Sequence, residues 1–294
     1  MNWVGAVVQG VLVGGWYALA ACGLSLTFGI MRLVNIAHGD LAVCGAYLTL
    51  VLSSALGLPV GYTLPLVLPI AFAIGVALHL LLFGRALRGG PLAPVLVTFG
   101  LSVMIENLLV AGLSADPRSL DAGRLALAGV RVTAFGSVIT LSWLRIAGFL
   151  TALAVLGGLH LLLARTSFGR LVRATSDDLD TARLVGVRVR PVFATVAGIA
   201  VATAALAGVF LGMTATFDPY AGGLSLIFAF EAVVIGGLGS LWGTLLGGVT
   251  IGLVQQLAAQ WDVQYTVLAV HLLFFAVLAV RPQGFFPASE PEAA

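Results

Sequence analysis

The sequence contains no lysine and few charged residues of any kind. Its 14 basic residues are all arginine, and with 12 acidic residues they make up 9% of the 294 residues, whereas a soluble domain carries about 25%. Hydrophobic residues make up 60%. So few ionisable side chains cannot cover a water-facing surface, so most of the chain must face lipid or other apolar helices. The composition predicts an integral membrane protein and argues against a soluble enzyme, a nucleic-acid-binding protein and a disulfide scaffold.

Cysteine is nearly absent, and the motifs of several enzyme classes are missing. Cys22 and Cys44 both lie inside apolar runs, and no cysteine and histidine spacing typical of a metal site occurs. There is no Gly-x4-Gly-Lys-Ser/Thr loop, nucleophile elbow or His-Glu-x-x-His motif. We therefore expect no metal, no cofactor and no enzymatic activity in this chain. Any ATP that powers the protein must be bound, with its magnesium ion, by a partner chain.

Apolar runs long enough to cross a bilayer recur along the sequence. A spanning helix needs about 20 apolar residues. Runs that qualify are 4–30, 38–56, 63–84, 92–113, 143–164, 191–213 and 264–280. The apolar stretch 224–260 is interrupted by glycines and predicts two short or re-entrant helices. The fold class expected is an all-α integral membrane protein, a polytopic bundle of about 8–10 transmembrane helices, some of them short or broken, in a single transmembrane domain over residues 1–294.

The arginines are distributed unevenly between alternate loops. If loop 165–190 is cytoplasmic, ten arginines lie inside, namely Arg32, Arg85, Arg88, Arg165, Arg170, Arg173, Arg183, Arg188, Arg190 and Arg281, and four lie outside, namely Arg118, Arg124, Arg131 and Arg145. Because cytoplasmic loops retain positive charge, the sequence predicts an external N-terminus and a cytoplasmic tail at 282–294. Loop 114–142 is then external, and its Thr/Val/Phe alternation predicts a small hairpin.

The loop 165–190 is the most charged segment. Thr175 followed by Asp178 has the spacing of a capping box, and Gly186 can close a helix that starts there. We expect a short surface helix at about 176–185. The residues that could couple this loop to another protein are Arg170, Asp177, Asp178, Asp180, Thr181, Ala182, Arg183 and Gly186. The helix could dock on another protein, or the loop could be solvated and its arginines could merely set the topology.

Polar residues inside the apolar runs are candidates for a translocation pathway or gate. Thr98, Ser102 and Glu106 recur every four residues on one face, beside Asn107, and Glu231 lies among aromatic and aliphatic residues. A charge at the bilayer centre costs about 2.5–3.5 kcal/mol on insertion scales, so each acid needs a partner or a water-filled path. Each could equally be a structural tie to a neighbouring helix.

Polar residues also interrupt the boundary between the first two runs. Asn35, His38, Gly39 and Asp40 could form a hinge that caps the second helix, or could contact a substrate. The other three histidines, His79, His160 and His271, are expected to hydrogen-bond between helices.

Rows of small residues predict close helix packing. Gly239, Gly243 and Gly247 are four residues apart, as are Gly208 and Gly212. Residues at this spacing share a helix face, where small side chains let two backbones approach each other in lipid.

Four segments resemble one transporter family. They are Arg32-Leu33-Val34-Asn35-Ile36-Ala37-His38-Gly39-Asp40 with Gly45-Ala46-Tyr47, Gly169-Arg170 through Gly186, Gly236-Gly237-Leu238-Gly239-Ser240 with Gly243 and Gly247-Gly248, and Arg281-Pro282-Gln283-Gly284. The chain resembles the permease subunits of branched-chain amino acid ABC transporters, of the Liv-type H class, nearly end to end. Asp180-Thr181-Ala182-x3-Gly186 is similar to the Glu-Ala-Ala-x3-Gly signature by which such permeases dock on their ATPases, with Asp for Glu and Thr for Ala.

The resemblance implies a heteromeric importer in the bacterial cytoplasmic (inner) membrane. Its other chains would be a second homologous permease, two cytoplasmic ABC ATPases and an external substrate-binding protein, with membrane lipid around the permeases and no nucleic acid. The cargo would be branched-chain or related hydrophobic amino acids, and the absence of a visible polar binding cluster favours an apolar substrate.

Three alternatives remain open at this point. Related permeases carry urea, short amides or sugars. A stand-alone secondary transporter would use Glu106 and Glu231 to carry protons. A structural or assembly subunit would need none of the polar intramembrane residues.

Overall fold

The structure is a computed structural model that describes residues 3–123, 125, 128–134 and 137–286. The last eight residues of the predicted tail, 287–294, and Arg124 lie outside the described residues. The protein is an all-α membrane bundle with one small hairpin.

Seven helical segments among the described residues are long and apolar enough to span a membrane. They are α1 (Trp3–Met31), α2 (His38–Leu56), the continuous stretch Val60–Ala86, α5 (Ala93–Leu113), α7 (Trp143–Arg165), α10 (Val189–Thr214) and α12 (Leu241–Ala258). Val60–Ala86 comprises α3 (Val60–Leu78), the π-helix η1 (His79–Phe83) and α4 (Gly84–Ala86). Two shorter apolar helices, α11 (Ala221–Gly236) and α13 (Tyr265–Val280), complete the nine predicted segments. Helix α13 has 16 residues and is shorter than the spanning helix expected at 264–280.

The glycine-interrupted stretch 224–260 forms two helices, as predicted, but only one of them is short. The break falls at Gly237–Ser240, where Gly237 and Gly239 have φ values of 109° and 82°. The 18 residues of α12 are long enough to span a membrane. Gly239 therefore lies in a turn and not on a helical packing row, which corrects the sequence-based expectation.

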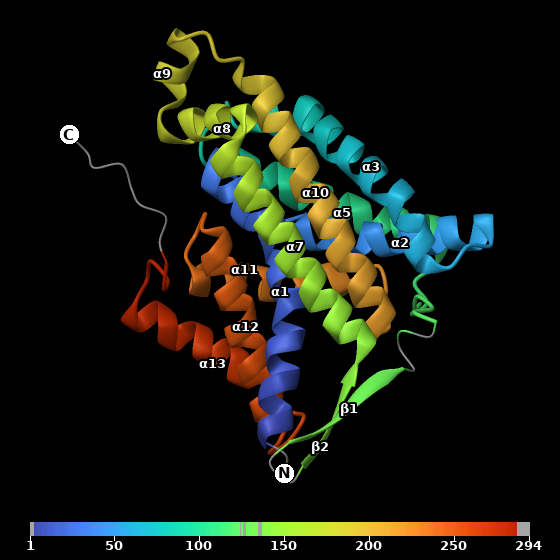
Figure 1. Ribbon diagram of the computed structural model, residues 1–294. Helices are drawn as coiled ribbons and strands as arrows, with labels where there is room; N and C mark the ends of the chain where they lie inside the picture. Colours follow the sequence, from blue (N-terminus) through green and yellow to red (C-terminus); the bar gives the residue numbers. More distant parts are fainter. Residues whose placement is uncertain (1–2, 124, 126–127, 135–136, 287–294) are drawn as a thin grey trace.

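Helix α1 is the central element of the bundle (Figure 1). It packs against α12, α10, α7 and α11, and α10 in turn packs against α2 and α3. Two short helices, α8 (Ser167–Asp177) and α9 (Leu179–Leu184), lie at one end, and the N-terminus lies at the opposite end beside the hairpin of β1 (Gly129–Ala134) and β2 (Ser137–Ser142). The strands are antiparallel, with Gly129 opposite Ser142, so the predicted hairpin is present.

Backbone contacts at small residues hold the central helices together. A Cβ placed on Gly208 would lie 1.8 Å from the Ala42 carbonyl oxygen, and one on Gly247 would lie 2.0 Å from that of Ala232. A Cβ placed on Gly243 would likewise lie 2.3 Å from the Gly236 carbonyl oxygen. At all three glycines another helix occupies the space of a side chain.

The segment after α13 folds back onto α11. The Phe285 and Phe286 amides donate hydrogen bonds of 2.9 Å to the Ile235 and Gly236 carbonyls. The turn requires Gly284, whose φ is 79°. The Arg281-Pro282-Gln283-Gly284 motif thus satisfies carbonyl groups at the C-terminal end of a helix.

Replacing Gly208 by leucine should destabilise the bundle. The new side chain would collide with the α2 backbone at Ala42, and overpacking of this kind costs about 1–3 kcal/mol or more. Gly158→Leu is the matched control, because Gly158 is exposed and nothing lies within 4 Å of its Cβ position. Thermal unfolding of the two variants in detergent checks this, and equal melting temperatures would contradict it.

Candidate functional site

The chain unwinds between α1 and α2, and the polar residues predicted there are deeply buried. Asn35, His38 and Asp40 are 2%, 2% and 1% exposed. His38 Nε2 lies 2.9 Å from the Ala20 carbonyl oxygen and ties the start of α2 to the middle of α1. None of these side chains caps α2, because its N-cap is Ala37 and no side chain hydrogen-bonds there. The capping role expected from the sequence is therefore wrong, whereas a tie between helices is present.

Asp40 lies where α2, α5 and α11 meet. Its Oδ1 would be 1.8 Å from a Cβ on Gly222, and a Cβ on Gly39 would be 1.9 Å from the Gly222 carbonyl oxygen. Ser102 and Glu106 of α5 lie close enough to the Asp40 carboxylate to interact with it electrostatically. Asp40 Oδ1 itself has no hydrogen-bond partner within the described part of the chain.

The predicted stripe on α5 faces this region. Thr98 is fully buried, and its hydroxyl bonds to Pro94 O at 2.9 Å and lies 3.5 Å from Val34 O in the unwound segment. Ser102 and Glu106 are half-buried, and Asn107 is exposed. The structure thus brings the stripe to Asp40 but leaves its outer edge uncovered.

Glu231 forms a second polar group on α11. It is 3% exposed, and its Oε1 lies 2.5 Å from His271 Nδ1 on α13. The His271 ring stacks on Phe228 with centroids 6.0 Å apart. This pair supplies the partner that a buried carboxylate needs, and it confirms the expected interhelical role of His271. Glu231 Oε2 has no hydrogen-bond partner among the residues described.

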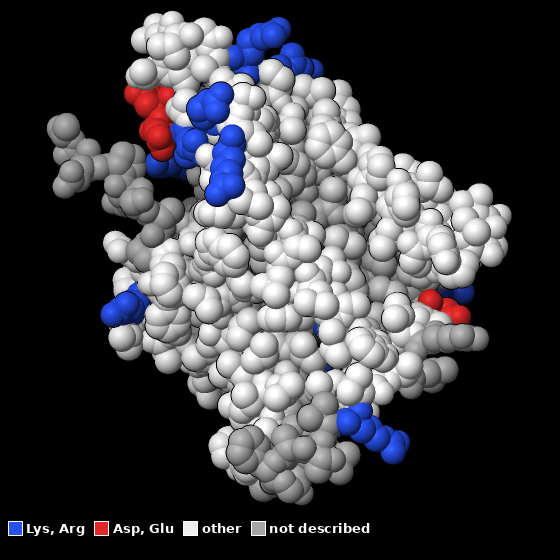
Figure 2. All heavy atoms as spheres, in the orientation of Figure 1, with Lys and Arg blue, Asp and Glu red and all other residues white. Residues whose placement is uncertain are grey.

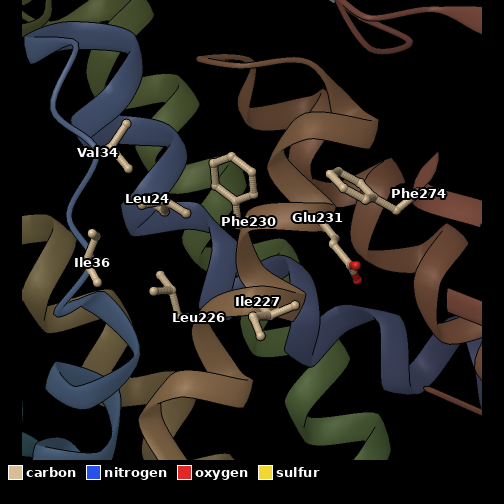
Figure 3. Close-up of a pocket in the computed structure, with 8 residues that line it drawn as sticks. All are labelled: Leu24, Val34, Ile36, Leu226, Ile227, Phe230, Glu231 and Phe274. Atoms are coloured by element: carbon tan, nitrogen blue, oxygen red, sulfur yellow. The ribbon is translucent and has the colours of Figure 1, made fainter. Parts of the chain in front are cut away.

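A small apolar pocket connects Glu231 to the unwound segment (Figure 3). It is lined by Leu24, Val34, Ile36, Leu226, Ile227, Phe230, Glu231 and Phe274. Glu231 carries the one charged group among the side chains labelled in Figure 3, and it lies at the edge of the pocket near Phe274. The acids of the two polar groups, Asp40 and Glu231, therefore lie on different helices beside one segment of unwound backbone.

The other two intramembrane histidines behave differently from expectation. His79 packs edge-on against Phe193 at 6.0 Å, and His160 packs against Trp242 at 5.7 Å. Neither imidazole ring makes a hydrogen bond to another described residue. The prediction of interhelical hydrogen bonds is wrong for both, because aromatic rings and not polar groups face them.

Charged side chains gather at the α8–α9 end, above a band with very little charge (Figure 2). The single helix predicted at 176–185 is two helices, broken at Asp178. Thr175 does not cap, because it lies inside α8 and bonds to Leu171 O and Val172 O. Asp178 caps α9 instead and accepts hydrogen bonds from the backbone amides of Asp180 and Thr181 at 2.9 and 3.0 Å.

Helix α9 is held at both ends. The Thr181 hydroxyl donates to Asp178 at 2.5 Å, and this bond together with the two amide bonds lowers the pKa of Asp178 below its usual value. At the other end Gly186, with φ of 87°, lets its amide reach Arg183 O at 3.0 Å. Six residues of helix are thereby fixed in direction, as expected from Gly186.

Two aliphatic side chains at the C-terminal end of α9, called here its tip, are exposed. Leu184 is 87% exposed and Val185 is 73% exposed, whereas Ala182 is buried. A shallow groove lined by Phe168, Leu171, Val187, Pro191 and Val192 adjoins Val185. The exposed Asp180–Arg183 pair, 3.2 Å apart, flanks the tip. Sequence patterning missed Leu184 and Val185, since apolar residues in a helical period ordinarily face inward.

The chain was also compared with known proteins. Residues 6–279 match a family described as branched-chain amino acid transport system / permease component. The chain belongs to this family. This branched-chain permease family match covers all nine membrane segments except the first three residues of α1 and the last residue of α13.

Individual relatives agree with the family. The high-affinity branched-chain amino acid transport system permease protein BraD of Pseudomonas aeruginosa is 32% identical, over 97% of this chain and 96% of that protein. The corresponding permease protein LivH of Escherichia coli is 29% identical, over 97% and 95%. The fructose import permease protein FrcC of Rhizobium meliloti is 29% identical, over 74% and 63%. No solved structure matches the chain.

Replacing His271 by leucine should destabilise the protein by about 1–3 kcal/mol, because it removes the hydrogen-bond partner of a buried carboxylate. The double variant Glu231→Leu/His271→Leu should recover much of this loss, since two apolar groups leave no charge unpaired. Thermal unfolding of the wild type, Glu231→Leu, His271→Leu and the double variant gives a double-mutant cycle that measures the interaction between the two side chains. Additive effects of the two single changes would contradict a direct pairing.

Proposed function

We propose that this chain is a membrane-spanning permease subunit of an ABC importer for branched-chain or related hydrophobic amino acids. The observation that carries the proposal is the tip of α9, where Leu184 and Val185 stand exposed on a helix fixed by Asp178 and Gly186. Exposed aliphatic residues on a rigid support are what a partner protein needs for docking. The match to the branched-chain permease family supports the cargo.

The α8–α9 end would face the cytoplasm and receive an ATPase, which binds ATP and magnesium. The arginine bias of this end supports that orientation, and the N-terminus and hairpin at the opposite end would then face the external binding protein (Figure 1). Two ATPases serve two permeases, so a second permease chain is required.

A second permease would cover the outer face of α5. This helix exposes Leu96, Phe99 and Leu108, at 68%, 57% and 63%, beside the half-buried Glu106 and the exposed Asn107. A carboxylate and an amide facing lipid are costly. A partner helix or a water-filled path between two permeases removes that cost, which supports placing the second permease against this face.

Movement of α9 would be transmitted to the bundle through its two neighbours. Helices α8 and α9 connect α7 to α10, and α10 is among the most buried helices of the fold. ATP binding and hydrolysis on the partners would shift these helices as rigid bodies and alternate access to the pathway.

A sugar importer is the second candidate, because the fructose permease of Rhizobium meliloti matches 74% of the chain.

Purification of the tagged chain from native membranes should yield two ATPases and a second permease. Once reconstituted with its binding protein, this complex should accumulate leucine when ATP is hydrolysed and not with a non-hydrolysable analogue. ATP-driven uptake of fructose or urea, with no uptake of leucine, would overturn the assignment of the cargo. A chain that purifies alone and transports in a proton gradient would overturn the ABC mechanism.

The docking role of α9 is tested by Leu184→Asp. A charge on the exposed tip should weaken ATPase association at least about tenfold without harming the fold, because Leu184 packs against little of its own chain. Leu184→Met keeps an apolar contact and should retain coupling, and Arg88→Ala tests an exposed residue elsewhere in the chain. Copurification and ATP-driven uptake are the measurements, and wild-type association of Leu184→Asp would place docking elsewhere.

A further inference from the structure

A cavity of about 590 Å³ opens inside the protomer. It adjoins the two polar groups described above, because its lining includes Ala20, whose carbonyl contacts His38, and Phe228, which stacks on His271. Its walls come from α1, α7, α10, α11 and α12, with Ala42 of α2. Arg145 and Ser142, which border the hairpin, mark its place in the half of the molecule opposite α8 and α9. Ligand pockets for small molecules fall between about 300 and 1,000 Å³, so the cavity is large enough for a free amino acid.

Arg145 supplies a positive charge to this cavity. It is the third residue of α7 and directly follows the buried Leu144, and its own side chain is half-buried. One guanidinium N–H donates to Gln9 Oε1 at 2.5 Å, and Gln9 in turn donates to Thr140 O at 2.7 Å. No carboxylate of the described chain lies within ion-pair distance of Arg145. The guanidinium is thus oriented by a neutral amide while its charge stays uncompensated.

Neutral polar groups and aromatic rings lie on the other walls. Tyr17 donates a hydrogen bond of 2.8 Å to Gln255 Oε1, and its ring lies 5.2 Å from that of Phe228. The side-chain N–H groups of Gln255 and the side-chain amide of Gln256 make no hydrogen bond to another described residue. Aromatic faces attract an ammonium group and amide oxygens accept hydrogen bonds from it.

We propose that this cavity binds the carboxylate of an amino-acid cargo at Arg145, with the ammonium group toward Tyr17 and the glutamine amides and the side chain against Leu144, Leu211 and Phe228. The proposal rests on the importer function and names a binding site within a single permease. A cation, neutral hydrogen-bonding groups and an aliphatic wall match the three parts of an aliphatic amino acid. A neutral sugar or urea would leave the arginine charge without a partner, which is costly in a half-buried site.

The test uses the complete permease–ATPase complex in nanodiscs, without binding protein and without ATP. Equilibrium binding of radiolabelled leucine should be saturable and should weaken at least about tenfold in Arg145→Gln, because a charge-assisted hydrogen bond is lost. Arg145→Lys should restore part of the affinity. Arg131→Gln is the matched control, since Arg131 is an exposed arginine of the adjacent hairpin.

Competition by analogues tests which group Arg145 binds. Leucinol, which lacks the carboxylate, should compete poorly with leucine in the wild type, whereas 4-methyl-2-oxopentanoate, which lacks the ammonium group, should still compete. Equal competition by leucine and leucinol would overturn the assignment. So would native mass spectra in which an anionic phospholipid, and not leucine, is retained in a manner that depends on Arg145.

The binding measurement tests the cavity proposal and the uptake measurement tests the importer function, so each proposal can be overturned without the other. ATP-driven leucine uptake that is unchanged in Arg145→Gln, with no Arg145-dependent binding, would overturn the cavity proposal and leave the importer function standing. Arg145-dependent binding without ATP-driven uptake would support the cavity and overturn the importer function. A loss of uptake in Arg145→Gln with normal leucine binding would also count against the cavity, and normal complex assembly on size exclusion is required of every variant.

Discussion

Direct contact between the backbones of α1 and α12 is the constraint on which the other features depend. A Cβ on Gly14 would lie 2.4 Å from the Val249 Cα, and one on Gly252 would lie 2.3 Å from the Gly10 carbonyl oxygen. Lipid tails are as apolar as leucine, so helices in a membrane associate through such close packing. Because α1 is fixed by α12, and by α10 on another side, the chain beyond Met31 can unwind and remain ordered.

This framework links the two ends of the molecule. Helix α7 begins beside the cavity at Leu144 and Arg145 and ends immediately before α8, while α10 begins after α9 and reaches the cavity at Thr214. A 26-residue helix is about 39 Å long at 1.5 Å per residue. The helices on either side of the α8–α9 pair, α7 and α10, therefore also form walls of the cavity. A rigid-body shift at the α8–α9 end must change the shape of the cavity or be absorbed by bending of these helices.

The sequence predicted most of the spans and the small hairpin because hydropathy and strand alternation are local properties of the chain. It could not predict that Glu231 pairs with His271, since the partner lies 40 residues away and its choice depends on how α11 meets α13. The break at Asp178 was missed because Thr175 offers the same local chemistry one turn earlier. Arg145 was counted only as a topology signal, because the other walls of its cavity come from helices far apart in the sequence.

Under the proposed function, a cavity of this composition would leave selectivity largely to the external binding protein. A permease must bind its cargo strongly enough to admit it and weakly enough to release it. A carboxylate-bearing ligand would find one cation, Arg145, held by a neutral amide, while its ammonium group would meet the neutral side chains of Tyr17 and Gln255. Glu231 is the acid close enough to Tyr17 to interact with it electrostatically. An acid opposite the ammonium group would strengthen binding and slow release. The cavity-lining residues include no acid, so orientation of the cargo and rapid passage are compatible in one site.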